Sequence, residues 1–247
     1  IKKIIKIGDI DKNSNVLEIG AGLGSLTKEI IEKKPYKFIV IEKDKILTKS
    51  LKQNYSKFKN LIVINDDIIN FLKKNNIDKN VIIYGNLPYN ISTQILASLI
   101  FFKKWPPWYK TLILMFQKEV ADRIIAKNKS KDFGRLSILS NWRLDVYKHF
   151  DVSRNSFSPK PKVTSTVLSF TPKKKNEFYL NNPKNLETIT RILFSNRRKM
   201  INKSFAKLFN NDISVAKKLN INLKQRPEEL EIKMFYKIAM EYENLFG

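Results

Sequence analysis

The chain has 247 residues, and its 47 lysines and arginines against 23 aspartates and glutamates give a net charge of +24 at neutral pH. This excess of bases favours a polyanionic partner, above all a nucleic acid, over an anionic membrane surface. The chain contains no cysteine and a single histidine, which excludes disulfides, thiolate nucleophiles, cysteine-bound zinc, histidine triads and multi-histidine metal sites.

Four short runs rich in β-branched residues open the chain, and stretches with helical periodicity separate them. The runs are Asn15–Ile19, Lys37–Ile41, Leu61–Ile64 and Val81–Tyr84. An alternation of strands and helices is typical of a parallel sheet that helices cover. We therefore expect an α/β fold in this part of the chain.

The middle of the chain continues with helix and strand patterns. We expect helices over Thr93–Lys103, Gln117–Lys127 and Arg135–Trp142, and strands over Thr111–Phe116, 143–152 and 163–170. Apolar and polar residues alternate along 143–152, so His149 should point to the wetter face of that strand. The longest apolar run, Ile95–Phe102, is too short to span a bilayer, so we expect a cytoplasmic protein.

Beyond residue 175 only helical periodicity is left. Thr171–Lys175 and Asn181–Pro183 have the composition of a solvated linker. Pro227 suits the first turn of the last helix. In that helix one face would carry Leu230, Met234, Ile238, Tyr242 and Leu245. We expect an α/β domain over 1–175 and a small helical domain over 176–247.

A polar residue stands at or just after the end of each of the four predicted parallel strands, namely Glu18, Glu42, Asp67 and Asn86. In open α/β sheets ligands bind at the carboxyl ends of the strands, so these groups should meet at one rim. Glu42 stands where an acid accepts hydrogen bonds from ribose hydroxyls. Asp67 could accept from an adenine amino group, although Asp66 could do so too and either could cap the next helix.

Three of the seven glycines follow the first strand closely. Gly20, Gly22 and Gly24 would let the chain turn sharply and let a ligand approach the main chain. A dinucleotide fingerprint would require another glycine at position 25, where this chain has Ser25. Together with Glu42, the loop predicts an adenosine-containing cofactor rather than a dinucleotide bound through its pyrophosphate.

The fourth strand leads into Asn86-Leu-Pro-Tyr89. In isolation this is a strand end followed by a proline turn. At the end of the fourth strand the motif could supply hydrogen-bond acceptors that activate the exocyclic amine of adenine, which is otherwise a poor nucleophile. The Asn86 side-chain oxygen and the Leu87 carbonyl could accept hydrogen bonds from the amine in its pyramidal, nucleophilic form. Tyr89 could stack on an extruded base, with Phe157 as the opposite wall.

Five motifs follow one another along the chain. They are Val16-Leu-Glu-Ile-Gly-Ala-Gly-Leu-Gly-Ser-Leu-Thr27, Asn86-Leu-Pro-Tyr-Asn-Ile-Ser-Thr93, Phe116-Gln-Lys-Glu-Val-Ala-Asp-Arg123, Phe133-Gly-Arg-Leu-Ser137 and Phe157-Ser-Pro-Lys-Pro-Lys-Val163. In this order they resemble the KsgA family of ribosomal RNA adenine dimethyltransferases. The resemblance implies a Rossmann-like class I methyltransferase domain with a small C-terminal α-helical domain. It also implies N6,N6-dimethylation of two adjacent adenosines near the 3′ end of 16S rRNA during ribosome biogenesis.

Carried over residue by residue, the resemblance implies a cofactor site and a base site. S-adenosylmethionine would contact Glu18, Gly20, Gly22, Glu42, Asp67 and Asn86, and no metal is expected. The target adenine would be held by Asn86, Leu87, Tyr89 and Phe157. The partner would be 16S rRNA in the small subunit or its precursor, and the protein would act as a monomer. The family usually begins with a Gly-Gln-Asn-Phe-Leu-like segment that closes over the cofactor, and we expect the natural chain to carry it upstream of Ile1.

Three other functions compete with this interpretation. The Erm class methylates an adenosine of large-subunit RNA with the same catalytic motif. Phe194-Ser-Asn-Arg197-Arg198-Lys199 resembles the KsgA pattern instead, and we expect Arg197, Arg198 and Lys199 to bind RNA phosphates. A non-catalytic nucleic-acid-binding relative is disfavoured by the intact Asn86-Leu-Pro-Tyr89 motif. A DNA adenine methyltransferase would reveal itself by methyl transfer to duplex DNA.

Overall fold

The computed structural model describes residues 1–74, 78–102, 104–157, 160–175 and 177–247. Its contacts divide the chain into two compact units. The first consists of Ile1–Leu99, Lys104–Ala121 and Asp145–Pro172, and the second of Ile100–Lys103, Asp122–Leu144 and Lys173–Gly247. The predicted helical domain, 176–247, thus falls within the second unit, which also takes in Asp122–Leu144. The predicted boundary after residue 175 stays a prediction.

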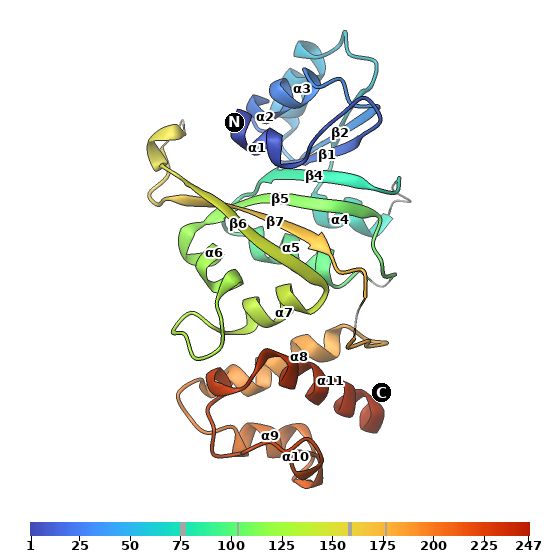
Figure 1. The fold of residues 1–247 in the computed structure, drawn as a ribbon. Coiled ribbons are helices and arrows are strands. Elements are labelled where there is room, and N and C mark those ends of the chain that lie inside the picture. Colours follow the sequence, from blue (N-terminus) through green and yellow to red (C-terminus); the bar gives the residue numbers. More distant parts are fainter. Residues whose placement is uncertain (75–77, 103, 158–159, 176) are drawn as a thin grey trace. The chain divides into compact units, whose positions relative to one another are not determined.

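A seven-stranded sheet, counted over the described residues, is the framework of the first unit. Its strands are β1 (Asn15–Ile19), β2 (Lys37–Glu42), β3 (Leu61–Asn65), β4 (Val81–Asn86), β5 (Tyr109–Gln117), β6 (Leu144–Val152) and β7 (Ser165–Pro172). They lie in the order β3-β2-β1-β4-β5-β7-β6 (Figure 1). Strands β1 to β5 pair in parallel, which confirms the predicted parallel sheet, and β7 pairs antiparallel with β5.

The direction in which successive strands are added reverses between β1 and β4. Strands β2 and β3 lie on one side of β1, whereas β4 lies on its other side. Such a reversal places the loops that follow the two central strands next to each other, and open α/β sheets bind ligands there. Helix α1 (Lys2–Ile7) precedes β1, and the helices α2 (Ser25–Ile31), α3 (Lys45–Asn54), α4 (Ile68–Lys74) and α5 (Ser92–Ile100) connect the five parallel strands. Helix α6 (Lys118–Ile125) follows β5.

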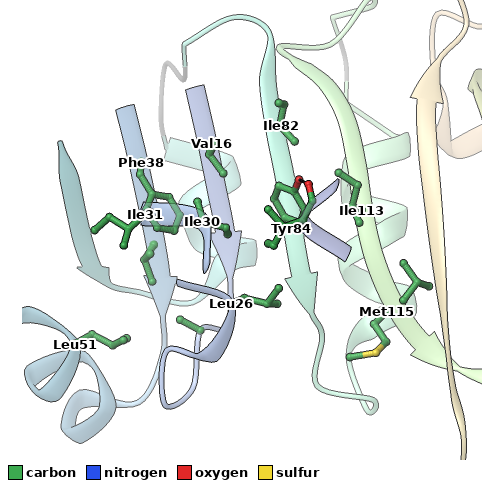
Figure 2. Packing of buried hydrophobic residues seen from close by; sticks show 14 residues of the cluster. Val16, Leu26, Ile30, Ile31, Phe38, Leu51, Ile82, Tyr84, Ile113 and Met115 are labelled. Carbon is green, nitrogen blue, oxygen red and sulfur yellow. Dashed lines mark hydrogen bonds between the residues drawn. The ribbon is translucent and has the colours of Figure 1, made fainter. Parts of the chain in front are cut away.

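A hydrophobic core packs one face of the sheet against α2. Figure 2 shows this cluster, whose labelled residues are Val16, Leu26, Ile30, Ile31, Phe38, Leu51, Ile82, Tyr84, Ile113 and Met115. The Tyr84 hydroxyl lies inside the core and donates a hydrogen bond to the Ile5 carbonyl at 2.8 Å. A buried hydroxyl needs such a partner, and this bond fixes α1 to the central strand β4.

The second unit is helical and is held by aromatic packing. Its elements include α7 (Arg135–Arg143), α8 (Lys184–Leu193), α9 (Asn202–Leu208), α10 (Ser214–Lys218) and α11 (Ile232–Phe246). The rings of Phe194 and Phe235 stack with centroids 5.6 Å apart, and Phe133 lies 6.3 Å from each of them. Offset and edge-on contacts of this kind stabilise aromatic clusters beyond their buried area.

The start and the buried face of the last helix differ from the prediction. Pro227 begins a short 3₁₀ turn, Pro227–Glu229, and α11 starts only at Ile232. Leu230 is therefore extended rather than helical, and a periodicity counted from it misplaces the helix face. The buried residues of α11 are Phe235, Tyr236, Ile238 and Ala239. Leu245, which was predicted to share the buried face, is 54% exposed.

Smaller differences concern single residues. The helix predicted over Thr93–Lys103 ends at Ile100, and Lys103 lies outside the described residues. His149 was predicted to point to the wetter face of its strand, but it is half-buried like its neighbours Lys148 and Phe150, and its Nε2 forms a hydrogen bond with Ser169 Oγ at 2.8 Å. None of the helices in the described ranges has the length and apolar character needed to cross a membrane.

Candidate active site

The glycine loop after β1 has the left-handed backbone that its composition predicted. Gly20, Gly22 and Gly24 have φ angles of +70°, +58° and +85°, a region that disfavours residues with a Cβ. A Cβ at Gly24 would lie 2.9 Å from Leu51, so that glycine is needed for packing. A Cβ at Gly22 would meet no described atom within 4 Å. The loop therefore has an open side, at Gly22, that a ligand could fill.

The carboxylate of Glu42 supports this loop from the end of β2. Glu42 Oε2 accepts a hydrogen bond from the Gly22 N–H at 2.9 Å, and Oε1 accepts one from the Asp44 N–H, also at 2.9 Å. Each carboxylate oxygen can accept a second hydrogen bond. Glu42 therefore positions the glycine loop and keeps acceptor capacity for a ligand hydroxyl.

Glu18 is a buried carboxyl group at the same rim. It is 1% exposed, and its Oε2 accepts a hydrogen bond from the Thr27 hydroxyl at 2.7 Å. The other oxygen, Oε1, has no partner in the described part of the chain. Burial raises the pKa of Glu18 to about 7; the Thr27 hydroxyl opposes this shift and the charge of Glu42 adds to it. An orphaned buried acceptor of this kind calls for a ligand donor.

The acids after β3 form local contacts. Asp67 Oδ2 accepts a hydrogen bond from Lys43 Nζ at 2.9 Å, and Oδ1 accepts one from the Ile69 N–H at the start of α4. The Lys43 ammonium and the Ile69 N–H lower the pKa of Asp67. Asp66 Oδ1 accepts from the Asp67 N–H at 2.8 Å. Asp67 thus caps α4, which was one of the two roles considered for it from the sequence. Its contact with an adenine stays a prediction.

The motif after β4 lies beside the glycine loop. A Cβ built on Gly20 would be 3.9 Å from Pro88 Cδ and 4.0 Å from the Asn86 carbonyl oxygen. Asn86 is exposed, and its side chain has no hydrogen-bond partner among the described residues, whereas Leu87 is buried. The Asn86 main chain therefore lies beside the glycine loop, and its exposed side-chain amide can serve a ligand.

Tyr89 is half-buried, and hydrogen bonds hold both its hydroxyl and its backbone. Its hydroxyl lies 2.7 Å from Ser165 Oγ, and its backbone carbonyl accepts from Ser92 Oγ at 3.1 Å. Phe157 packs partly buried against the core cluster. Ser158 and Pro159 of the same motif lie outside the described residues. The predicted base contacts of Tyr89 and Phe157 stay predictions.

The three basic residues predicted to bind RNA lie in the second unit and form different contacts there. Arg197 Nε donates to Glu228 Oε2 at 2.6 Å, and its guanidinium also donates to the Ser130 carbonyl. Arg198 and Lys199 are exposed and line a cavity of about 400 Å³ together with Lys203 and Arg226. Arg197 therefore links segments of the unit, whereas Arg198 and Lys199 belong to a cationic pocket suited to phosphate.

Sequence reasoning missed several of these residues. Thr27 is the hydroxyl that binds Glu18, and Ser165 is the partner of Tyr89. Lys203 and Arg226 complete the cationic pocket. Thr27 lies three residues after Gly24, so its closeness to the glycine loop could be seen in the sequence. Ser165 and Arg226 come from segments distant in sequence, and no local pattern marks them.

Comparison with known proteins gives a consistent result. Residues 1–244 match the family described as ribosomal RNA adenine dimethylase. The chain is 49% identical to the ribosomal RNA small subunit methyltransferase A of Pelagibacter ubique, over 100% of this chain and 93% of that protein. A dimethyladenosine transferase structure from Plasmodium falciparum is 28% identical with a TM-score of 0.80, covering 98% and 94% of the two chains. The 23S rRNA methyltransferase ErmE shares the fold at 20% identity, with a TM-score of 0.69 over 98% and 96%.

Proposed function

The chain belongs to the ribosomal RNA adenine dimethylase family, and from this premise we propose that it dimethylates N6 of two adjacent adenosines near the 3′ end of small-subunit rRNA. S-adenosylmethionine is the proposed methyl donor. The chain spans nearly all of the small subunit methyltransferase A from Pelagibacter ubique. That relative supports the small subunit as the substrate, whereas the likeness to ErmE reflects the fold alone.

The rim at the ends of β1, β2 and β4 fits an adenosine-type sulfonium cofactor. Open space at Gly22 leaves room for it, and Glu42 has acceptor capacity for ribose hydroxyls. The orphaned Oε1 of Glu18 is suited to accept from a cationic amino group. When bound, S-adenosylmethionine supplies an electrophilic methyl group. Glu18, Gly20, Gly22 and Glu42 would hold it, with Asp67 and Asn86 at the margin.

Asn86 and Leu87 would act on the nucleophile. The lone pair of the adenine amine is delocalised into the ring, so the amine must become pyramidal to react. The Asn86 side-chain oxygen and the Leu87 carbonyl would accept its two hydrogens and stabilise that form. After methylation the nitrogen is cationic and loses a proton to water, so no side chain has to act as a base. The monomethylated amine keeps one N–H, which either acceptor can receive, so the product of the first transfer can be methylated again.

Tyr89 and Phe157 would hold the extruded base. Enzymes that modify an atom of a stacked base first extrude that base, and aromatic side chains in the active site replace the stacking that it loses. The hydrogen bond between Tyr89 and Ser165 limits rotation of the ring. Arg198 and Lys199, in the cationic pocket of the second unit, would contact phosphates of the same RNA.

The observation that carries this proposal is the Asn86 main chain beside the open glycine loop, with an exposed side-chain amide that has no partner among the described residues. The test offers tritiated S-adenosylmethionine with unmethylated small subunits, large subunits, naked rRNA or duplex DNA. Label should enter small-subunit RNA, and mass spectrometry of digested RNA should find N6,N6-dimethyladenosine at two adjacent positions. Label in large-subunit RNA, or monomethyladenosine alone, would contradict the proposal.

A further inference from the structure

A basic groove runs along α3 in the first unit, and its described lining residues differ from those assigned above. Lys45, Lys49 and Lys52 line it, with Thr48 and Ser56 on the same segment and Asn65 at the end of β3. Its volume is about 640 Å³. The three lysines are four and three residues apart along the helix, so they project from one face of α3.

The lysines of this groove are uncommitted. Lys45, Lys49 and Lys52 are exposed, and none forms an ion pair with a carboxylate among the residues that the structure describes. The nearby acid, Asp44, already accepts hydrogen bonds from the Ile46 and Leu47 N–H groups as the helix cap. The groove therefore presents three positive charges that no described residue neutralises.

The spacing of these charges suits a nucleic acid strand. At 1.5 Å per residue, Lys45 and Lys52 are about 10 Å apart along the helix axis. In double-stranded DNA each strand carries a phosphate about every 3.4 Å of the helix axis, so a row of lysines of this length can meet more than one phosphate of a backbone. Among the described residues, those that line the groove include no aromatic side chain that could stack on a base. Its contacts would therefore be to the backbone and independent of base sequence.

The groove is also joined to the candidate active site. Asn65 Nδ2 donates to the Glu42 and Lys43 carbonyls at 3.0 and 2.9 Å. Thr48 Oγ1 donates to the Glu42 carbonyl at 3.2 Å and to the Asp44 carbonyl at 2.7 Å. Two residues that line the groove, Thr48 and Asn65, thus hold the turn that carries the Glu42 carboxylate.

We propose that Lys45, Lys49 and Lys52 form a second RNA-binding surface, which contacts the phosphate backbone of the substrate RNA. The proposal rests on the proposed function, because it takes the RNA of the methylation reaction as the partner. The surface contributes affinity and orientation, and it takes no part in the choice of base.

The test compares two charge-matched variants of the full chain. The groove variant is Lys45→Gln, Lys49→Gln, Lys52→Gln. The control is Lys12→Gln, Lys33→Gln, Lys110→Gln, which removes the same charge from exposed positions in the same unit. These control lysines lie before β1, after α2 and at the start of β5, so they are near the amino ends of the parallel strands. Binding of unmethylated small subunits is measured from about 0.05 to 0.3 M salt.

The groove variant should bind subunits about tenfold more weakly at about 0.1 M salt, with the slope of log affinity against log salt reduced by about 2 to 3. The control variant should keep most of the wild-type slope. Equal slopes for the two variants, or an unchanged slope in the groove variant, would overturn the proposal. Calorimetry with S-adenosylmethionine checks that both variants fold. Methylation by the wild type is assayed in the same preparation, so failure of the proposed function would be seen separately.

Discussion

The hydroxyls of Tyr89 and Ser165 lie 2.7 Å apart and join the motif after β4 to the first residue of β7. Ser165 is fully buried, so its position is set by the pairing of β7 with β5. Its hydrogen bond transmits that fixed position to the ring of Tyr89. The antiparallel strand therefore has a direct part in the geometry of the proposed base site.

Ser165→Ala should lower kcat about tenfold with a smaller effect on KM for the subunit, because Tyr89 loses the partner that orients its ring. Ser165→Thr keeps the hydroxyl and should restore most of the rate. Combined with Tyr89→Phe, Ser165→Ala should add little, because both changes remove the same hydrogen bond. Additive losses in single-turnover rate would show that Ser165 does not act through Tyr89.

Asn86→Ala should reduce the transfer step by about a hundredfold or more, because its side-chain acceptor acts mainly in the transition state. Affinity for S-adenosylmethionine should change little, as measured by calorimetry. Asn90→Ala, at another exposed asparagine of the same motif, is the matched control and should keep its rate. If affinity fell while single-turnover rate held, Asn86 would be a cofactor ligand rather than an acceptor for the amine.

The cofactor-free protein should lose stability between mildly acidic and mildly alkaline pH through Glu18. Its pKa rises from 4.5 to about 7 on folding, so the folded chain holds the proton more tightly than the unfolded chain. This contribution is fully present below pH 4.5 and is lost as the pH rises through about 7. Its size is on the order of 3 kcal/mol.

Urea unfolding of the wild type and of Glu18→Gln at pH 5 to 8 measures this effect. The wild type should lose more free energy of unfolding over that range than Glu18→Gln, in which the group cannot ionise. Comparing the two proteins cancels the titration of all other groups. Parallel curves would mean that Glu18 is ionised in the folded chain throughout the range.

Substitutions at the neighbouring residues Arg197 and Arg198 should have different effects, the first on stability and the second on RNA binding. Arg197→Gln breaks the pair with Glu228 and should lower the free energy of unfolding by about 1 kcal/mol. Arg198→Gln should leave stability within about 0.5 kcal/mol and reduce the salt slope of RNA binding by about 1. An unchanged slope for Arg198→Gln would remove the cationic pocket from the RNA interface.

The early strands could be predicted from the sequence to within one or two residues. Runs such as Asn15–Ile19 and Lys37–Glu42 are rich in β-branched residues and are buried in a parallel sheet, so composition alone marks them. The place of β7 between β5 and β6 could not be predicted, because long-range pairing rather than a local pattern decides it. The start of α11 was misplaced because Pro227 suits a 3₁₀ turn as well as an α-helix.

The candidate site shows the same division. Gly22 and Glu42 were found because a glycine cluster and an acid at a strand end have a local signature, and the structure joins them by a hydrogen bond. Arg197 was grouped with Arg198 because both belong to one basic string. Its partner, Glu228, lies thirty-one residues away, and only folding brings that carboxylate to it.

The turn that follows β2 lies between the two proposed binding sites, one for S-adenosylmethionine and one for the RNA backbone. The Glu42 side chain supports the glycine loop, while its carbonyl is held by Asn65 and Thr48, which line the lysine groove. If each ligand tightens this turn, their binding free energies are linked, and linkage is reciprocal. Cofactor that strengthens RNA binding would then be retained more firmly by the RNA-bound enzyme, by the same factor. The site would thus favour a ternary complex over either binary one.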